Sequence, residues 1–201
     1  MFTKNADESI RALAEVALIA QIRRWLGALA PTSPQGMGDD CAVVDWPKGL
    51  KQILTTDSLS YGQHFDDSVS AHDAGAKLIK RNLSDIAAMG GLPGEALLNL
   101  LCGGDLQIDW LAAFFEGICD ACQEYDLPIV GGDISTLPNG QFTAVLSLTG
   151  YSEKPPLLRK GAQAGDALYV TGTLGGSLLK KHYNFKPRLT EGQWLAQSMA
   201  C

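Results

Sequence analysis

The fold is decided by residues 71–102, AHDAGAKLIKRNLSDIAAMGGLPGEALLNLLC, where a helical pattern changes into an apolar run. The spacing predicts an amphipathic helix over 71–89. Gly90, Gly91 and Pro93 end it, because glycine favours helix C-termini and proline cannot continue a helix. The apolar run 95–102 then predicts a strand. This stretch is therefore a helix followed by a buried strand.

The same mixture of elements continues on both sides of this stretch. Further helices are predicted at 6–29 and 107–125, and residues 57–70 are predicted to be irregular. Further strands are predicted at 41–45, 52–56, 128–130, 142–151 and 167–171. Amphipathic helices among strands indicate an α+β or α/β sandwich in which helices cover a sheet.

A polar stretch at 152–165, which contains Pro155 and Pro156, predicts a domain boundary. We expect an N-terminal domain over 1–151, a linker over 152–166 and the start of a second domain over 167–201.

Charge and composition limit the classes of function. The formal net charge is −6, which argues against a nucleic-acid binder because such proteins carry a basic face. Nucleotide binding stays compatible, since metal ions can bridge carboxylates and phosphates. No run is long and apolar enough for a membrane span, and the N-terminus does not resemble a signal peptide. We expect a cytoplasmic protein.

The cysteines indicate free thiols, because their number, five, is odd. Cys119 and Cys122 form a C-x-x-C pair, but the pair lies inside a helical pattern and no second ligand pair accompanies it. We expect helix packing from these two residues.

Aspartates beside glycines, or at predicted strand and helix ends, are the strongest candidates for a functional site. Mg²⁺ prefers oxygen ligands, and converging carboxylates can hold it while leaving room for phosphates. Aspartates also cap helices and end strands without any further role. Spacing does not decide between these interpretations. The candidates are Asp39, Asp40, Asp57, Asp85 and Asp133.

Several motifs together resemble the thiamine-monophosphate kinase family, which belongs to the aminoimidazole-ribonucleotide-synthetase-like superfamily. The most specific is Asn82-Leu83-Ser84-Asp85-Ile86-Ala87-Ala88-Met89-Gly90. The others follow the family's order and spacing. They are Gly38-Asp39-Asp40-Cys41-Ala42, Thr55-Thr56-Asp57-Ser58-Leu59, His64-Phe65, Val130-Gly131-Gly132-Asp133 and the stretch 158–166.

The resemblance implies an α+β N-terminal domain with a mixed sheet covered by helices, and a homodimer whose two sheets join in a barrel across subunits. It also implies ATP- and Mg²⁺-dependent phosphorylation of thiamine monophosphate to thiamine diphosphate by direct transfer, without a nucleophilic residue. Such catalysis is mostly positioning and charge neutralisation, because two anionic groups must meet.

Residue roles follow from the same resemblance. It assigns Phe115 and Arg159 to the nucleotide and His64 to the thiamine phosphate. The nucleotide contacts also include Gly132 and Asp133. The implied ligands of several Mg²⁺ ions, two of which can act through backbone or hydroxyl oxygens, are Asp39, Thr55, Thr56, Asp57, Asp85 and Asp133. Considered alone, Phe115 is a core residue by its periodicity, His64 a surface or packing histidine, and Arg159 a solvated linker charge.

The chain departs from the family in its second half. The family's Ser-Asp-Gly motif is absent, and Phe185 replaces a proline in the segment that carries His182, Pro187 and Arg188. We expect a chain truncated within the second domain, with residues 167–201 poorly packed or docked unusually. One alternative is a non-catalytic ATP/Mg-binding or dimerisation remnant.

The other alternative is a different enzyme of the superfamily, such as a hydrogenase-maturation protein or a selenophosphate synthetase. Residues 1–35 contain no cysteine, which counts against the latter.

Overall fold

The computed structural model describes residues 1–31, 51–152, 154–158 and 162–198. Within them, four strands form one mixed sheet in the order β1-β4-β2-β3. The strands are β1 (Lys51–Ser60), β2 (Leu92–Gly103), β3 (Ile129–Leu137) and β4 (Phe142–Ser152). Strand β4 runs antiparallel to β1 and β2, and β2 runs parallel to β3.

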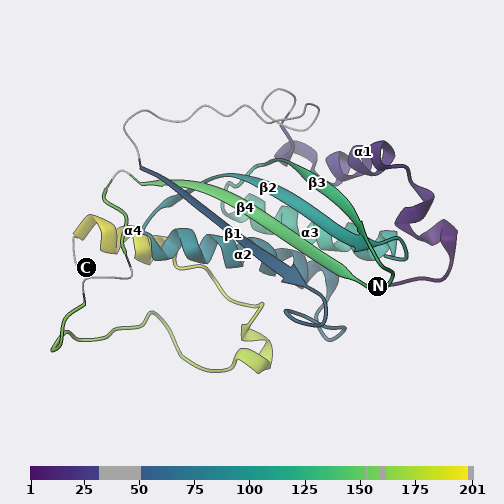
Figure 1. The fold of residues 1–201 in the computed structure, drawn as a ribbon. Helices are drawn as coiled ribbons and strands as arrows, with labels where there is room; N and C mark the ends of the chain where they lie inside the picture. Colours follow the sequence, from purple (N-terminus) through teal and green to yellow (C-terminus); the bar gives the residue numbers. More distant parts are fainter. Residues whose placement is uncertain (32–50, 153, 159–161, 199–201) are drawn as a thin grey trace.

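Helices cover one face of this sheet (Figure 1). Helices α2 (Ala71–Ala88) and α3 (Ile108–Glu124) pack against each other, α1 (Glu15–Leu26) contacts α3, and α4 (Leu189–Ser198) contacts α2. The short helices are η1 (Ala6–Glu8), η2 (Ile10–Ala12), η3 (Gly27–Leu29) and η4 (Ser177–Lys181). The architecture is thus the expected α+β fold with a mixed sheet.

The core lies between the sheet and the helices. Alternate residues of β4, from Phe142 through Ala144 and Leu146 to Leu148, are at most 2% exposed. Leu146 pairs with Asp57 of β1 on one side and with Leu98 of β2 on the other. Because residues paired across strands share a face, this row identifies the helix-covered face.

Two glycines bring α2 and α3 into backbone contact. A Cβ atom added to Gly75 would lie 2.0 Å from the carbonyl oxygen of Phe114, and one added to Gly117 would lie 1.8 Å from that of His72. Each helix therefore presents a glycine to the other's backbone. This contact sets how closely α2 and α3 approach each other.

The strands and the first helix differ from the sequence-based expectations. Strands β1 and β3 run beyond the predicted ends, so Asp57 and Asp133 lie inside strands instead of in loops. The predicted helix 6–29 divides into η1, η2, α1 and η3, because Ser9 forms a bridge with Gln107 and Leu13 is extended. Tertiary contacts thus override local helix preference there.

The C-terminal segment packs well at one end and poorly at the other. The strand expected at 167–171 does not form, and Leu168 and Tyr169 are 96% and 91% exposed, because no strand of the described residues pairs with them. Helix α4, in contrast, packs tightly on α2, where a Cβ atom at Gly192 would lie 2.0 Å from the Ala87 carbonyl oxygen. The strand expected at 41–45 lies outside the described residues.

Three cysteines are buried free thiols, as expected. Burial raises the pKa of the Cys119 thiol to about 11 and that of the Cys122 thiol to about 12. Both belong to the buried side of α3, which confirms their packing role. Among the residues described, no helix is long and apolar enough to cross a bilayer.

We expect Gly117→Ala to destabilise the protein, although alanine is the better helix former by about 1 kcal/mol. The new methyl group would overlap the His72 carbonyl, and such overpacking costs about 1–3 kcal/mol or more. Chemical denaturation should therefore show a lower free energy of unfolding. The exposed neighbour Glu116 provides the control Glu116→Ala, which should change it by less than about 0.5 kcal/mol. A Gly117→Ala protein as stable as the parent would refute the close contact.

Candidate metal and nucleotide site

Four polar side chains meet where the edge strand β1 faces α2. Thr55 and Asp57 lie two residues apart on the helix-covered face of β1. Arg81 and Asp85 lie one turn apart on α2. Thr55 Oγ1 donates to Asp85 Oδ2 at 2.6 Å, and Arg81 Nη2 donates to Asp57 Oδ1 at 2.7 Å. We name these four residues the β1–α2 cluster.

Apolar neighbours hold the cluster in place. On β1, Ile53 and Leu59 flank Thr55 and Asp57 on the same face and are 7% and 0% exposed. On α2, Leu83 and Ile86 are fully buried beside Asp85. Ser70 caps the start of α2 by accepting the Asp73 N–H at 3.0 Å. The polar cluster is therefore built on rigid elements.

The two carboxylates of the cluster have different partners. Asp57 faces the Arg81 guanidinium, which also donates from Nη1 to the Ser58 carbonyl at 2.7 Å. Asp85 receives the Thr55 hydroxyl and, within the described part of the chain, has no cationic partner. Asp85 is also exposed to solvent. It is the carboxylate most available to an added cation.

Thr56 and Asp133 lie on the opposite face of the sheet. Asp133 pairs with the exposed Asn99, and Thr56 pairs with Ser147. Figure 1 shows no helix over this face. Because successive residues of a strand point to opposite faces, the fold separates these two from Thr55 and Asp57. Of the six expected metal ligands, the structure describes five, and their side chains are divided between the two faces of the sheet.

Gly132 is required by the close approach of β2 and β3. A Cβ atom there would lie 1.7 Å from the Leu98 carbonyl oxygen. Strand packing therefore explains why this position is a glycine, independently of its proposed contact with the nucleotide.

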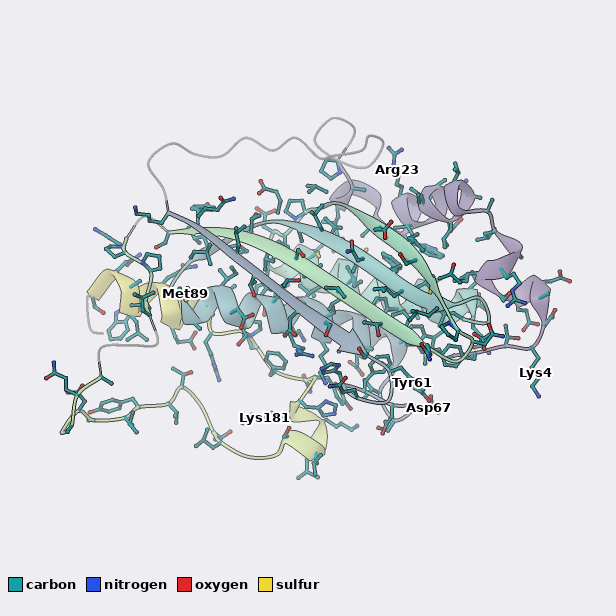
Figure 2. The ribbon with its side chains drawn as sticks, in the orientation of Figure 1. Lys4, Arg23, Tyr61, Asp67, Met89 and Lys181 are labelled. Atoms are coloured by element: carbon teal, nitrogen blue, oxygen red, sulfur yellow. The ribbon has the colours of Figure 1, made fainter. Side chains whose placement is uncertain are left out.

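His64 lies just after β1, in a second group of basic residues. Its Nδ1 accepts the Ser60 N–H at 2.9 Å, so this nitrogen carries no proton and Nε2 holds it. Lys77 Nζ donates to the His64 carbonyl and lies 2.8 Å from His182 Nδ1. Figure 2 shows the surroundings, with Tyr61 and Asp67 after β1 and Lys181 on the C-terminal segment. We name His64, Lys77 and His182 the basic group.

Burial governs the protonation of this group. Lys77 is 6% exposed, and burial followed by the nearby Arg81 charge lowers the pKa of its amine. Burial is also the main cause that lowers the pKa of His64 and of His182. Arg81 and Lys77 lower the His64 value further, and Lys77 lowers that of His182. Both pKa shifts therefore favour the neutral form of the imidazoles.

Phe115 lies away from these residues. It is fully buried, and its ring centroid lies 5.5 Å from that of Trp25. Its burial supports the core interpretation, and its assignment to the nucleotide stays a prediction. Asp39, Asp40 and Arg159 lie outside the described residues.

Sequence reasoning assigned no site role to Lys77, Arg81 or His182. Lys77, Arg81 and Asp85 are spaced by four residues, so one stripe of the predicted helix carries all three. That spacing was visible in the sequence, and Lys77 on an otherwise apolar side was a further signal.

The donor set fits a hard cation in part. Thr55, Asp57 and Asp85 offer only hydroxyl and carboxylate oxygens, which suit Mg²⁺ and not softer metals. Over the ranges that the structure describes, no three His, Cys, Asp or Glu side chains form a group that could hold a metal. Mg²⁺ commonly uses one or two carboxylates with waters and phosphates, so a site around Asp85 is chemically reasonable.

Comparison with known proteins identifies the family. Residues 38–152 match the family described as AIR synthase related protein, N-terminal domain. The chain belongs to this family.

A curated relative shows to which members of the family the chain is similar. The chain is 40% identical over 177 residues to the thiamine-monophosphate kinase of Rhodopirellula baltica, a match that covers 84% of this chain and 55% of the relative. The chain thus spans about half the length of this relative.

Solved structures agree with this relationship. The structure of AaThiL complexed with AMPPCP and TMP matches with a TM-score of 0.69 at 30% identity, covering 98% of this chain and 66% of that one. The hydrogenase maturation protein HypE in complex with ATP matches with a TM-score of 0.59 at 20% identity, over 74% of this chain and 43% of its own. At that identity HypE shares the fold alone.

Acidification should loosen the C-terminal segment around His182. In the folded protein the pKa of both imidazoles lies below the ordinary 6.5. A state in which the C-terminal segment has left Lys77 therefore binds protons more readily. The stabilisation is complete above about pH 6.5 and is lost as the pH falls through the lowered folded values. Protonated His182 would also face Lys77, although Asp66 partly offsets this charge.

Hydrogen exchange at Tyr183 and Asn184, whose amides bond to the Lys180 carbonyl, measures this effect. In the parent protein, exchange should accelerate below about pH 6.5 by more than the intrinsic pH dependence of amide exchange. In His182→Gln this additional acceleration should be smaller. His72→Gln is the matched control, since His72 pairs with Asp120 instead. An identical profile in His182→Gln would exclude His182 as the responsive group.

Proposed function

We propose that this chain binds Mg²⁺ and ATP as part of a thiamine-monophosphate kinase, which phosphorylates thiamine monophosphate to thiamine diphosphate. The observation that carries the proposal is the pairing of Asp85 with Thr55 at the edge of β1. Asp85 belongs to the most family-specific motif, and its carboxylate is solvent-exposed and free of a cationic partner within the described chain. The similarity to the Rhodopirellula baltica kinase supports the same reaction.

In this proposal, each group of residues has a separate task. Asp85 and Thr55 present oxygens to a metal ion, with Asp57 beside them and Asp39 as a further ligand. Bound Mg²⁺ would neutralise and orient the phosphates that must approach each other. His64, neutral and with its proton on Nε2, can donate a hydrogen bond to a substrate phosphate. Gly132, Asp133 and Arg159 are proposed to contact the nucleotide.

The opposite face of the sheet supports a second metal position and an assembly. Thr56 and Asp133, also proposed as metal ligands, point their side chains away from Asp85, to the other side of the sheet. Several ions would therefore be divided between the two faces. The same face exposes Leu54 and Leu97, whose exposed fractions are 69% and 44%. A second copy of the chain, with its sheet closing a barrel, would cover them.

Asp85→Asn tests the metal site. Removing the charge should weaken binding of Mg·ATP by at least about 100-fold, because even residues that only orient metal ligands contribute 10–100-fold. Isothermal titration of the 201-residue chain measures this affinity. Asp126→Asn is the control, since Asp126 is exposed and asparagine tolerates its positive φ of 51°. Equal affinity of Asp85→Asn and the parent would remove Asp85 from the site.

The parent protein and the Asp85→Asn variant also test turnover. Formation of thiamine diphosphate from thiamine monophosphate, ATP and Mg²⁺, with loss of product in Asp85→Asn, would establish the kinase activity. Mg·ATP binding without product would favour the alternative role of a binding or dimerisation module.

Light scattering tests the assembly. The chain should have twice its monomer mass of 21.4 kDa at micromolar concentration. Leu97→Asp should reduce the mass to that of the monomer, because a charge would be buried in an apolar interface. Leu168→Asp changes an equally apolar residue, 96% exposed outside the sheet, and should leave the dimer intact. A parent protein of monomer mass would refute the shared barrel.

A further inference from the structure

We propose that Arg81 is a built-in counter-ion that competes with the metal ion for Asp57 and so sets the Mg²⁺ affinity of the β1–α2 cluster. This inference rests on the proposed function, since it assumes a metal ion at Asp85. It goes beyond that function by assigning a role to a residue that no sequence motif singled out.

The contacts of Arg81 hold it against β1. Its Nη2 donates to Asp57 Oδ1 and its Nη1 donates to the Ser58 carbonyl, both at 2.7 Å. Asp57 Oδ1 also accepts the Ser58 N–H at 2.9 Å. The guanidinium is a planar fork, so its two contacts with adjacent residues of one strand fix its position. A metal ion that uses this carboxylate must share it with Arg81 or displace Arg81.

No other cation on this stripe of α2 takes that position in the described structure. Lys77 is one turn away, but its amine bonds to the His64 carbonyl and approaches His182. Arg81 stays charged at all relevant pH values, so changing the pH cannot release Asp57 by neutralising it. Arg81 therefore competes for Asp57 at every relevant pH, and only the binding of a metal ion can displace it from this carboxylate.

Charge counting gives the direction of the effect. Asp57 and Asp85 contribute −2 and Arg81 contributes +1, so the cluster carries −1 instead of −2. A divalent ion binds more weakly to the smaller negative charge. The side chains of Arg81 and Asp57 are 25% and 28% exposed, so their ion pair lies between fully exposed pairs, which contribute little, and buried pairs, whose loss leaves an uncompensated charge. Losing the competitor should raise the affinity about tenfold.

Arg81→Met tests the proposal, because methionine keeps an apolar stem without the charge. We expect Mg²⁺ alone to bind about tenfold more tightly to this variant in isothermal titration. Mg²⁺ should also raise its melting temperature more than that of the parent. Lys80→Met is the matched control, since it removes one positive charge from the adjacent residue of α2. An affinity for Arg81→Met no higher than that of Lys80→Met would overturn the proposal.

Asp57→Asn distinguishes competition for this carboxylate from a general change of charge. In the Asp57→Asn background, Arg81→Met should raise the Mg²⁺ affinity less than twofold, because the shared ligand is gone. An undiminished tenfold gain there would overturn the proposal. Circular dichroism of each variant checks that it is folded.

Asp85→Asn separates this inference from the proposed function. Loss of Mg²⁺ binding in Asp85→Asn, with no gain in Arg81→Met, would refute the role of Arg81 alone. Unchanged Mg²⁺ binding in Asp85→Asn would refute the metal site and, with it, the competition at Asp57.

Discussion

The backbone contact between α2 and α3 is the constraint on which the rest of the structure depends. Gly75 and Gly117 each leave room for the other helix's carbonyl group, so α2 lies close to α3 and above the edge of the sheet. Helix packing in which side chains separate the backbones would place the axes farther apart. Together with the packing of α2 on β1 and β4, these two glycines set where the polar residues of α2 lie.

The three polar residues of the α2 stripe, Lys77, Arg81 and Asp85, lie in different environments. Lys77 is buried between the His64 carbonyl and the His182 imidazole, Arg81 pairs with a carboxylate, and Asp85 meets a hydroxyl group and no cation among the described residues. The environment thus changes from cationic to anionic along the helix. In the proposed function a phosphate and a metal ion need opposite charges, and this stripe offers both within about two turns, or about 12 Å.

The sheet places the expected metal-binding side chains on two different faces. Thr55 and Asp57 share the helix-covered face with the buried core, whereas Thr56 and Asp133 share the face that no described helix covers. Strand geometry requires this division, because adjacent residues of a strand cannot point to the same side. The side-chain oxygens of these four residues are therefore presented on both faces of the sheet.

The sequence by itself determined the main helices, most strands of the sheet and the chemical type of the donors. The helical period at 71–89 and 107–125 predicted α2 and α3 nearly to their ends, since amphipathic spacing is a local property. It could not determine that β1 and β3 continue through Asp57 and Asp133, because pairing with Leu146 and Asn99 comes from distant strands. It also could not determine that Arg81 takes Asp57 or that Lys77 is buried under His182, because both depend on neighbours brought in by packing. Tertiary structure therefore decided which donors meet, and local spacing decided only which elements carry them.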